Sequence, residues 1–125
     1  MSMEEIGGVY LESILTSIKK LLGITEDYEH FDIDLIVDIN ASFARLTTLG
    51  VGSSEGFVIS DKSNTWTQFS DDPVIQGLSK KFIFLDVKLA FDTSISQSVI
   101  SSINEQKRET EWLLQDSMLK TNNNN

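Results

Sequence analysis

The chain has 125 residues, of which 40% are hydrophobic and none is cysteine. These values fit one folded domain with a single core, and they exclude a disulfide framework and a thiolate metal site. Ten basic and nineteen acidic residues give a net charge of −9, which argues against tight binding of nucleic acid because phosphates are bound through Lys and Arg.

Two helices are predicted before the glycine-rich middle of the chain. The first covers residues 4–22 and has apolar residues at helical spacing, namely Leu11, Ile14, Leu15, Ile18, Leu21 and Leu22. The second begins with Asp32 as its N-cap and continues to about residue 49. Gly50 follows at the position where a left-handed residue often ends a helix.

The segment after Gly50 predicts a short β-hairpin. Phe57-Val58-Ile59 and Thr65-Trp66-Thr67 are two runs typical of strands, separated by a polar turn. Gly50 and Gly52 give the backbone the freedom to turn sharply out of the second helix. We therefore expect the hairpin to be inserted between the second and third helices.

Two more helices are predicted in the second half. Asp72 and Pro73 are a typical N-cap and first residue, and the apolar residues that follow indicate a helix packed along others and ending near Phe91. The last helix is expected from Ser94 or Ser96 to about Met118. The predicted fold is thus mainly α: a small bundle of about four helices with one short hairpin, in a single domain over residues 1–118, followed by a disordered tail over residues 119–125.

The residues do not predict a catalytic, cofactor or metal site. Gly50, Gly52 and Gly56 come close to a dinucleotide-binding fingerprint, but the third glycine is one place late and a helix precedes the motif where a strand is required. His30 is the only histidine, which is too few for a zinc site without cysteine. The acidic residues around Asp32 lack the glycine of a calcium loop.

Location is also suggested by what the sequence lacks. No apolar run approaches the ~20 residues of a membrane helix, and the N-terminal residues lack the pattern of a secretory signal. We therefore expect a soluble intracellular protein without a membrane partner.

Apolar and aromatic side chains around the hairpin leave two interpretations open. A two-stranded hairpin is marginal alone, so it must pack on its own helices or pair with another subunit. Under the second interpretation the protein-interface residues are Phe57, Val58, Ile59, Trp66, Phe69 and Trp112.

Four segments carry a resemblance to a known family. The order ARLTTLGVG, GFVISDKSNTWTQF, KKFIFLDVKLAFD and EWLL resembles the head–tail connector (adaptor) proteins of long-tailed phages, over roughly residues 14–114. Two departures stand out. The family often has a proline pair after Phe91-Asp92 and an arginine after Glu111-Trp112, whereas this chain has Thr93-Ser94 and Leu113.

The resemblance implies a structural virion protein that is not an enzyme and needs no cofactor. Such a protein forms a homo-oligomeric ring at the portal vertex, extends the DNA channel and joins the capsid to the tail. The implied partners are further copies of the chain, the portal protein and a stopper or tail-completion protein, while DNA passes through without specific binding. Its implied location is the capsid–tail junction of the virion, and the host cytoplasm during assembly.

One alternative belongs to a different class: an acidic helical inhibitor that mimics DNA and binds a basic nucleic-acid enzyme. It explains the charge but not the aromatic positions.

Overall fold

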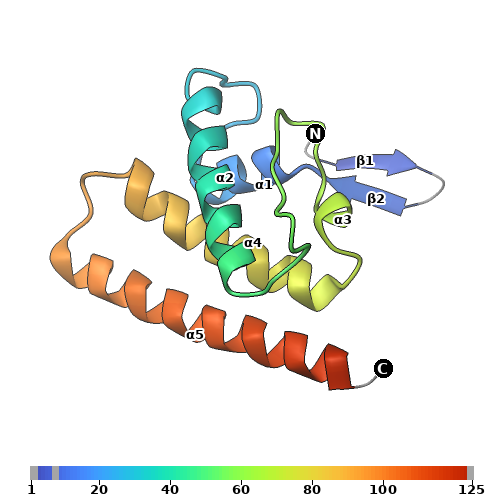
Figure 1. Ribbon diagram of the computed structural model, residues 1–125. Helices are drawn as coiled ribbons and strands as arrows, with labels where there is room; N and C mark the ends of the chain where they lie inside the picture. Colours follow the sequence, from blue (N-terminus) through green and yellow to red (C-terminus); the bar gives the residue numbers. More distant parts are fainter. Residues whose placement is uncertain (1–2, 7–8, 124–125) are drawn as a thin grey trace.

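The computed structural model describes residues 3–6 and 9–123, and it is mainly helical, as predicted (Figure 1). Its elements in chain order are β1 (Met3–Ile6), β2 (Val9–Glu12), α1 (Ile14–Leu21), α2 (Asp32–Thr48), α3 (Trp66–Phe69), α4 (Pro73–Phe91) and α5 (Gln97–Asn123). The two strands pair in antiparallel register, with Met3 opposite Glu12 and Ile6 opposite Val9.

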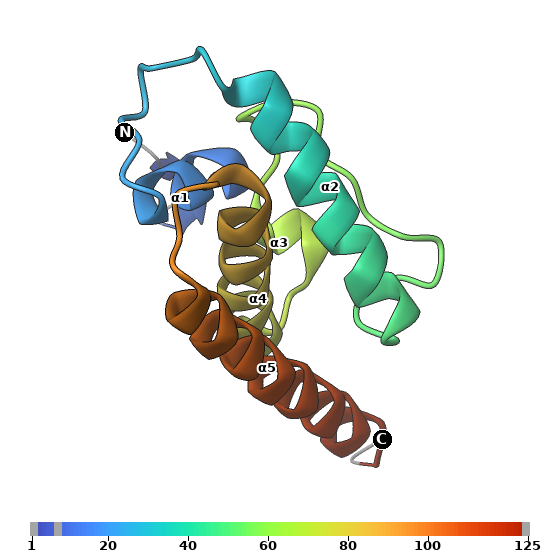
Figure 2. The same cartoon turned by 90° about the vertical axis from the view of Figure 1, so that its left-hand side faces the viewer.

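Helix α4 is the element on which the other helices pack. It contacts α1, α2, α3 and α5, and α5 returns antiparallel along it after a short connection (Figures 1 and 2). The start of α4 is the predicted one, because the Asp72 carboxylate accepts a hydrogen bond of 2.9 Å from the Val74 amide and Pro73 occupies the first turn. Its last residue, Phe91, also agrees with the prediction.

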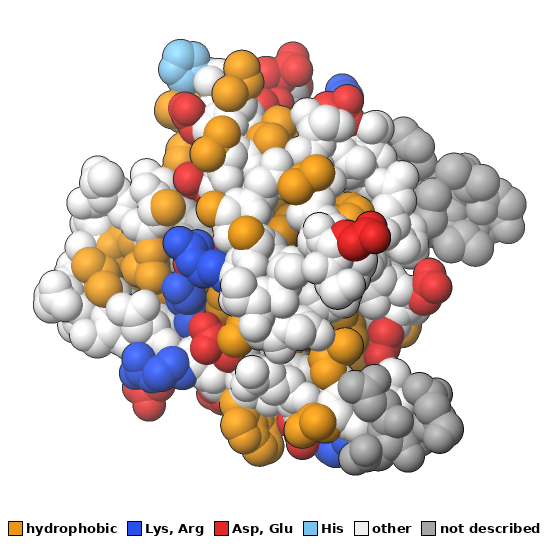
Figure 3. All heavy atoms as spheres, in the orientation of Figure 1, with side chains coloured by type: hydrophobic (Ala, Val, Ile, Leu, Met, Phe, Trp, Pro, Cys, Tyr) orange, Lys and Arg blue, Asp and Glu red, His pale blue; other side chains and the backbone are white. Residues whose placement is uncertain are grey.

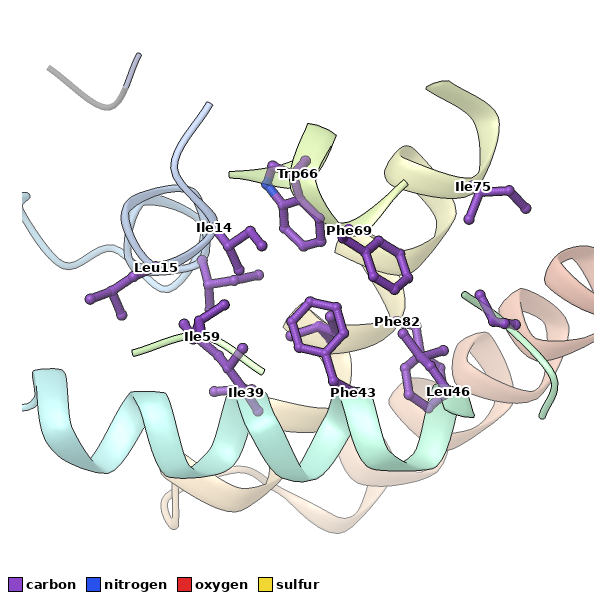
Figure 4. Packing of buried hydrophobic residues seen from close by; sticks show 14 of the residues in the cluster. Ile14, Leu15, Ile39, Phe43, Leu46, Ile59, Trp66, Phe69, Ile75 and Phe82 are labelled. Carbon is purple, nitrogen blue, oxygen red and sulfur yellow. The ribbon is translucent and has the colours of Figure 1, made fainter. Parts of the chain in front are cut away.

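The core lies between α1, α2, α3 and α4. Phe43 of α2 is at its centre, with the rings of Phe57 and Phe69 each 5.0 Å away between centroids (Figure 4). Trp66 also points into this core, and its indole N–H donates a hydrogen bond of 2.9 Å to the Ser17 hydroxyl on α1. The aromatic residues of α3 therefore join the first third of the chain to α2.

The predicted hairpin between the second and third helices is wrong. Residues 57–64, all described by the structure, contain no strand, and Trp66 begins the short helix α3. A capping box explains the difference, because the side chains of Thr65 and Gln68 each accept a bond from the other's backbone and fix a helix start. The one sheet among the described residues is the β1–β2 pair near the N-terminus.

The first predicted helix starts too early. Residues 3–6 and 9–12 are strands, and α1 begins at Ile14 because Ser13 caps it, with its hydroxyl accepting from the Thr16 amide. Gly7 and Gly8, which lie outside the described residues, are poor helix formers that weaken the earlier start.

The boundaries of the other two long helices differ in detail. The N-cap of α2 is Phe31 and not Asp32, which is the first helical residue and pairs with Lys19. Helix α5 continues to Asn123, past the predicted end near Met118. The predicted disordered tail stays a prediction, and its residues 124–125 lie outside the described residues.

Substitution of Phe82 tests the central place of α4. Its side chain has no exposed surface, so Phe82→Ala should lower the free energy of unfolding by about 3–5 kcal/mol through lost burial and the cavity it leaves. Leu119→Ala is the control, since Leu119 is 61% exposed and should change stability by less than about 0.5 kcal/mol. Urea unfolding measures both, and equal effects would contradict this arrangement.

Candidate functional site

The six residues predicted to form an interface separate into two groups. Ile59, Trp66 and Phe69 are buried in the core, and Phe57 is partly buried against it. Val58 and Trp112 are 69% and 63% exposed. The aromatic side chains of the predicted hairpin therefore stabilise the chain's own fold, and Val58 and Trp112 are the two with surface available to a partner.

Val58 owes its exposure to the way residues 50–59 lie along α2. Gly50, Gly52 and Gly56 have φ of +82°, +82° and +87°, so the predicted role of Gly50 and Gly52 in turning the chain is confirmed. The Asn40 side chain then donates to the Ile59 carbonyl at 2.9 Å and accepts from the Ile59 amide at 2.8 Å. This pair of bonds replaces a strand partner, directs Ile59 inward and leaves Val58 outside.

A small pocket of about 370 Å³ separates this segment from α2. It is lined by Asn40, Ala44, Thr47, Glu55, Gly56, Phe57 and Val58. Three of these residues, Asn40, Ala44 and Thr47, belong to α2.

The exposed side of α2 is a second candidate, which the sequence reasoning missed. Ile33 and Val37 are 79% and 63% exposed, and Ala41 one turn later is exposed too. Figure 3 shows hydrophobic and acidic side chains along the part of the surface that α2 forms. We call Ile33, Asp34, Val37, Asp38 and Ala41 the α2 outer face. Contiguous exposed apolar residues of this kind mark protein contacts.

The signal for this face was present in the sequence. Ile33, Val37 and Ala41 repeat every four residues, out of phase with the core residues Leu35 and Ile39. Two apolar stripes on one helix indicate one stripe for the core and one for a partner.

Beside this face, three long helices meet at one buried carboxylate. Asp86 of α4 accepts bonds from Ser42 and Arg45 of α2 and from Lys107 of α5, the last at 2.7 Å. Burial by itself would raise the pKa of Asp86, but the hydrogen bonds from Lys107 and Ser42 and the charges of Lys107 and Arg45 hold it below its ordinary value. The carboxylate is therefore ionised and fully engaged at neutral pH.

Asp38 shows the opposite effect. Its pKa is raised, first by partial burial and then by repulsion from Asp34 and Asp86, and Arg45 offsets this only in part. The α2 outer face consequently carries negative charge that the chain's own cations leave incompletely balanced.

The acidic loop before α2 is held in place by a buried lysine. Lys19 is 2% exposed, and its ammonium donates to the carbonyls of Glu26 and Tyr28 and pairs with Asp32 at 2.8 Å. A pocket of about 480 Å³ lies beside it. A buried charge is costly without such partners. The need of the Lys19 ammonium for these contacts therefore explains the conformation of the loop without a functional role.

His30 and the carboxylates are the side chains that could bind a metal ion in a chain without cysteine. His30 packs edge-to-face against Phe31, 4.8 Å between ring centroids. Within residues 3–6 and 9–123, no three His, Asp or Glu side chains come together in a way that would hold a metal ion. In the same part of the chain, none of the helices has the length and hydrophobicity to cross a membrane.

Comparison with known proteins adds a family. The model of a family described as phage connector protein matches residues 14–121, from the first residue of α1 to the last turn of α5. Neither the curated proteins nor the solved structures gave a significant match.

Two glycines offer a matched test of the turn after α2. Gly50 and Gly52 share φ of +82°, but an added Cβ meets nothing at Gly50 and lies 2.9 Å from the Phe69 ring at Gly52. Gly50→Ala should cost about 1 kcal/mol through backbone strain, and Gly52→Ala about 1–3 kcal/mol more through overpacking. Equal losses in chemical denaturation would contradict the close approach of Phe69.

The Asp86 cluster makes a pH-dependent contribution. Asp86→Asn keeps the size of the side chain but removes its charge, and should cost about 2 kcal/mol at neutral pH, below the range for fully buried pairs because Arg45 reaches solvent. Since the folded pKa lies below the ordinary value of 3.8, the unfolded chain takes up this proton first as the pH falls, and the stabilisation is lost as the pH passes through the folded pKa.

Denaturant titrations across this pH range check the expectation. The difference between the parent and Asp86→Asn should shrink as the pH falls below the ordinary carboxyl pKa of 3.8. The control is Glu109→Gln, which removes a carboxylate charge from the exposed surface of α5. A difference between the parent and Asp86→Asn that is independent of pH would contradict the ionised cluster.

Proposed function

This chain belongs to the phage connector protein family, and we propose that it is a structural virion protein that forms a ring at the portal vertex of the capsid. In this role it extends the DNA channel and joins the capsid to the tail or to the next neck protein. Its partners are other copies of itself, the portal protein and a stopper or tail-completion protein. The observation that carries the proposal is the family match over residues 14–121, which includes nearly all of the helical fold.

The arrangement of helices supports a subunit with a fixed shape. Asp86 joins α2, α4 and α5, and both of its carboxylate oxygens have partners. A buried polar cluster whose members are all satisfied restricts how helices pack. A connector that bears load between a capsid and a tail needs such rigidity.

Separate exposed sites support assembly with more than one neighbour. Val58 lies beside α2, and Trp112 lies on α5, which packs along α4. We propose both as contact residues. A ring subunit needs two different surfaces, one for each neighbour, and further surface for the proteins above and below.

The acidic charge supports passage of DNA in preference to binding. A net charge of −9 repels a phosphate backbone and offers few cations to hold it. The alternative of a DNA-mimicking inhibitor rests on this charge alone, whereas the connector role also agrees with the family.

Native mass spectrometry with negative-stain electron microscopy of the purified chain tests the proposal. We expect closed rings of identical subunits, formed by the chain alone or on addition of the portal protein. A chain that stays monomeric in both conditions, and that is missing from purified virions, would contradict a connector role.

A further inference from the structure

Helix α4 carries an exposed strip on the side away from α2. Val74, Gly77, Lys81, Phe84 and Lys88 follow one another at three- and four-residue spacing, and we call them the α4 strip. Val74 is 57% exposed, Gly77 and Lys81 are exposed, Lys88 is partly exposed, and Phe84 packs partly against the core and keeps some exposed surface. The strip is therefore both apolar and basic, in a chain that is otherwise strongly acidic.

Gly77 is the least expected residue of this strip. Glycine inside a helix is destabilising relative to alanine, yet its φ is not positive and an added Cβ would have nothing within 4 Å. The packing of the described residues thus gives no reason for glycine at this position. Gly77 also lines a recess of about 240 Å³ between the start of α4 and the residues Trp66 and Thr67 of α3. A neighbouring element that approaches the backbone closely accounts for both observations.

The α4 strip and the α2 outer face point in opposite directions. Asp86 faces α2, as its bonds to Ser42 and Arg45 show. Phe84 and Lys88 are each two residues from Asp86, which places them about 200° around the helix. The α2 outer face likewise lies opposite the residues that α2 buries against α4.

The two surfaces are complementary in charge. Lys81 forms no ion pair with any described residue, and neither does Asp34. Lys88 is 3.9 Å from Asp92, a loose pair at the end of α4. The repulsion that Asp38 experiences from Asp34 and Asp86 would be relieved by a cation brought in from outside.

We infer that the α4 strip of one copy packs on the α2 outer face of the next copy, with Lys81 placed against Asp34 and Asp38 and with Val74 and Phe84 against Ile33 and Val37. The inference rests on the proposed function and names the contact that closes its ring. Two complementary surfaces that face opposite ways cannot both be paired in one two-fold dimer, so the contact repeats head to tail. Such a contact generates a ring where the rotation between copies closes, as the proposed function requires.

Charge reversal tests this contact. Asp34→Lys and Lys81→Glu each put like charges together, and each should lower the ring fraction in native mass spectrometry by about tenfold or more. The double variant Asp34→Lys/Lys81→Glu restores opposite charges and should recover most of the ring fraction. The control, Lys62→Glu, makes the same charge change at an exposed lysine outside both surfaces and should behave as the parent.

A second variant separates assembly from folding. Gly77→Gln should raise the Tm of the isolated chain, because glutamine is a better helix former, and should lower the ring fraction by blocking close approach. Circular dichroism verifies that every variant keeps its helical content.

The outcomes distinguish the inferred contact from the proposed ring. Loss in both single reversals with recovery in the double variant supports the contact. If the parent forms rings and the single reversals do so equally well, or if the folded double variant does not recover, the contact is wrong although the ring stands. If single reversals form rings but no longer join other neck proteins, the two surfaces belong to a different virion partner, which also overturns the inference. A parent that forms no ring contradicts the proposed function itself.

Discussion

A single buried carboxylate sets the relation between the three long helices. Asp86 lies on α4, and its partners come from α2 and α5, so a shift of either helix along α4 would leave a buried charge without a partner. Hydrophobic contacts alone tolerate small shifts in register, whereas this cluster does not. The directions of the exposed sides of α2 and α4 follow from it, and so does the separation of Val58 from Trp112.

Sequence periodicity predicted the elements whose signals are local. The helix predicted from Asp32 to about residue 49 corresponds to α2, and Asp72 with Pro73 identified the start of α4. The glycine turns after α2 followed from residue type. The segments resembling a connector family lie within the range that the family model matches.

The errors arose where a contact distant in sequence decides the local structure. Phe57-Val58-Ile59 has strand propensity, but Asn40 satisfies the backbone of Ile59 from α2. For Trp66 and Phe69 the sequence left two interpretations open, an interface or the chain's own helices, and Phe43 provides the internal surface that they cover. The missed capping signals at Ser13 and Thr65 were local and readable. The α2 outer face could also have been predicted, by comparing its apolar stripe with the core stripe on the same helix.

The function proposed for this chain depends on shape and charge, and it requires no reactive group. An acidic subunit held rigid by its polar cluster, with two lysines on the α4 strip, suits self-assembly around a passage for DNA. The most direct measurement is a cryo-electron microscopy reconstruction of the neck of the intact virion, at a resolution that separates helices. We expect a closed ring of this chain between the portal and the next neck protein, with α2 and α4 of adjacent copies in contact. Density for another protein in that position, or this chain located elsewhere in the particle, would contradict it.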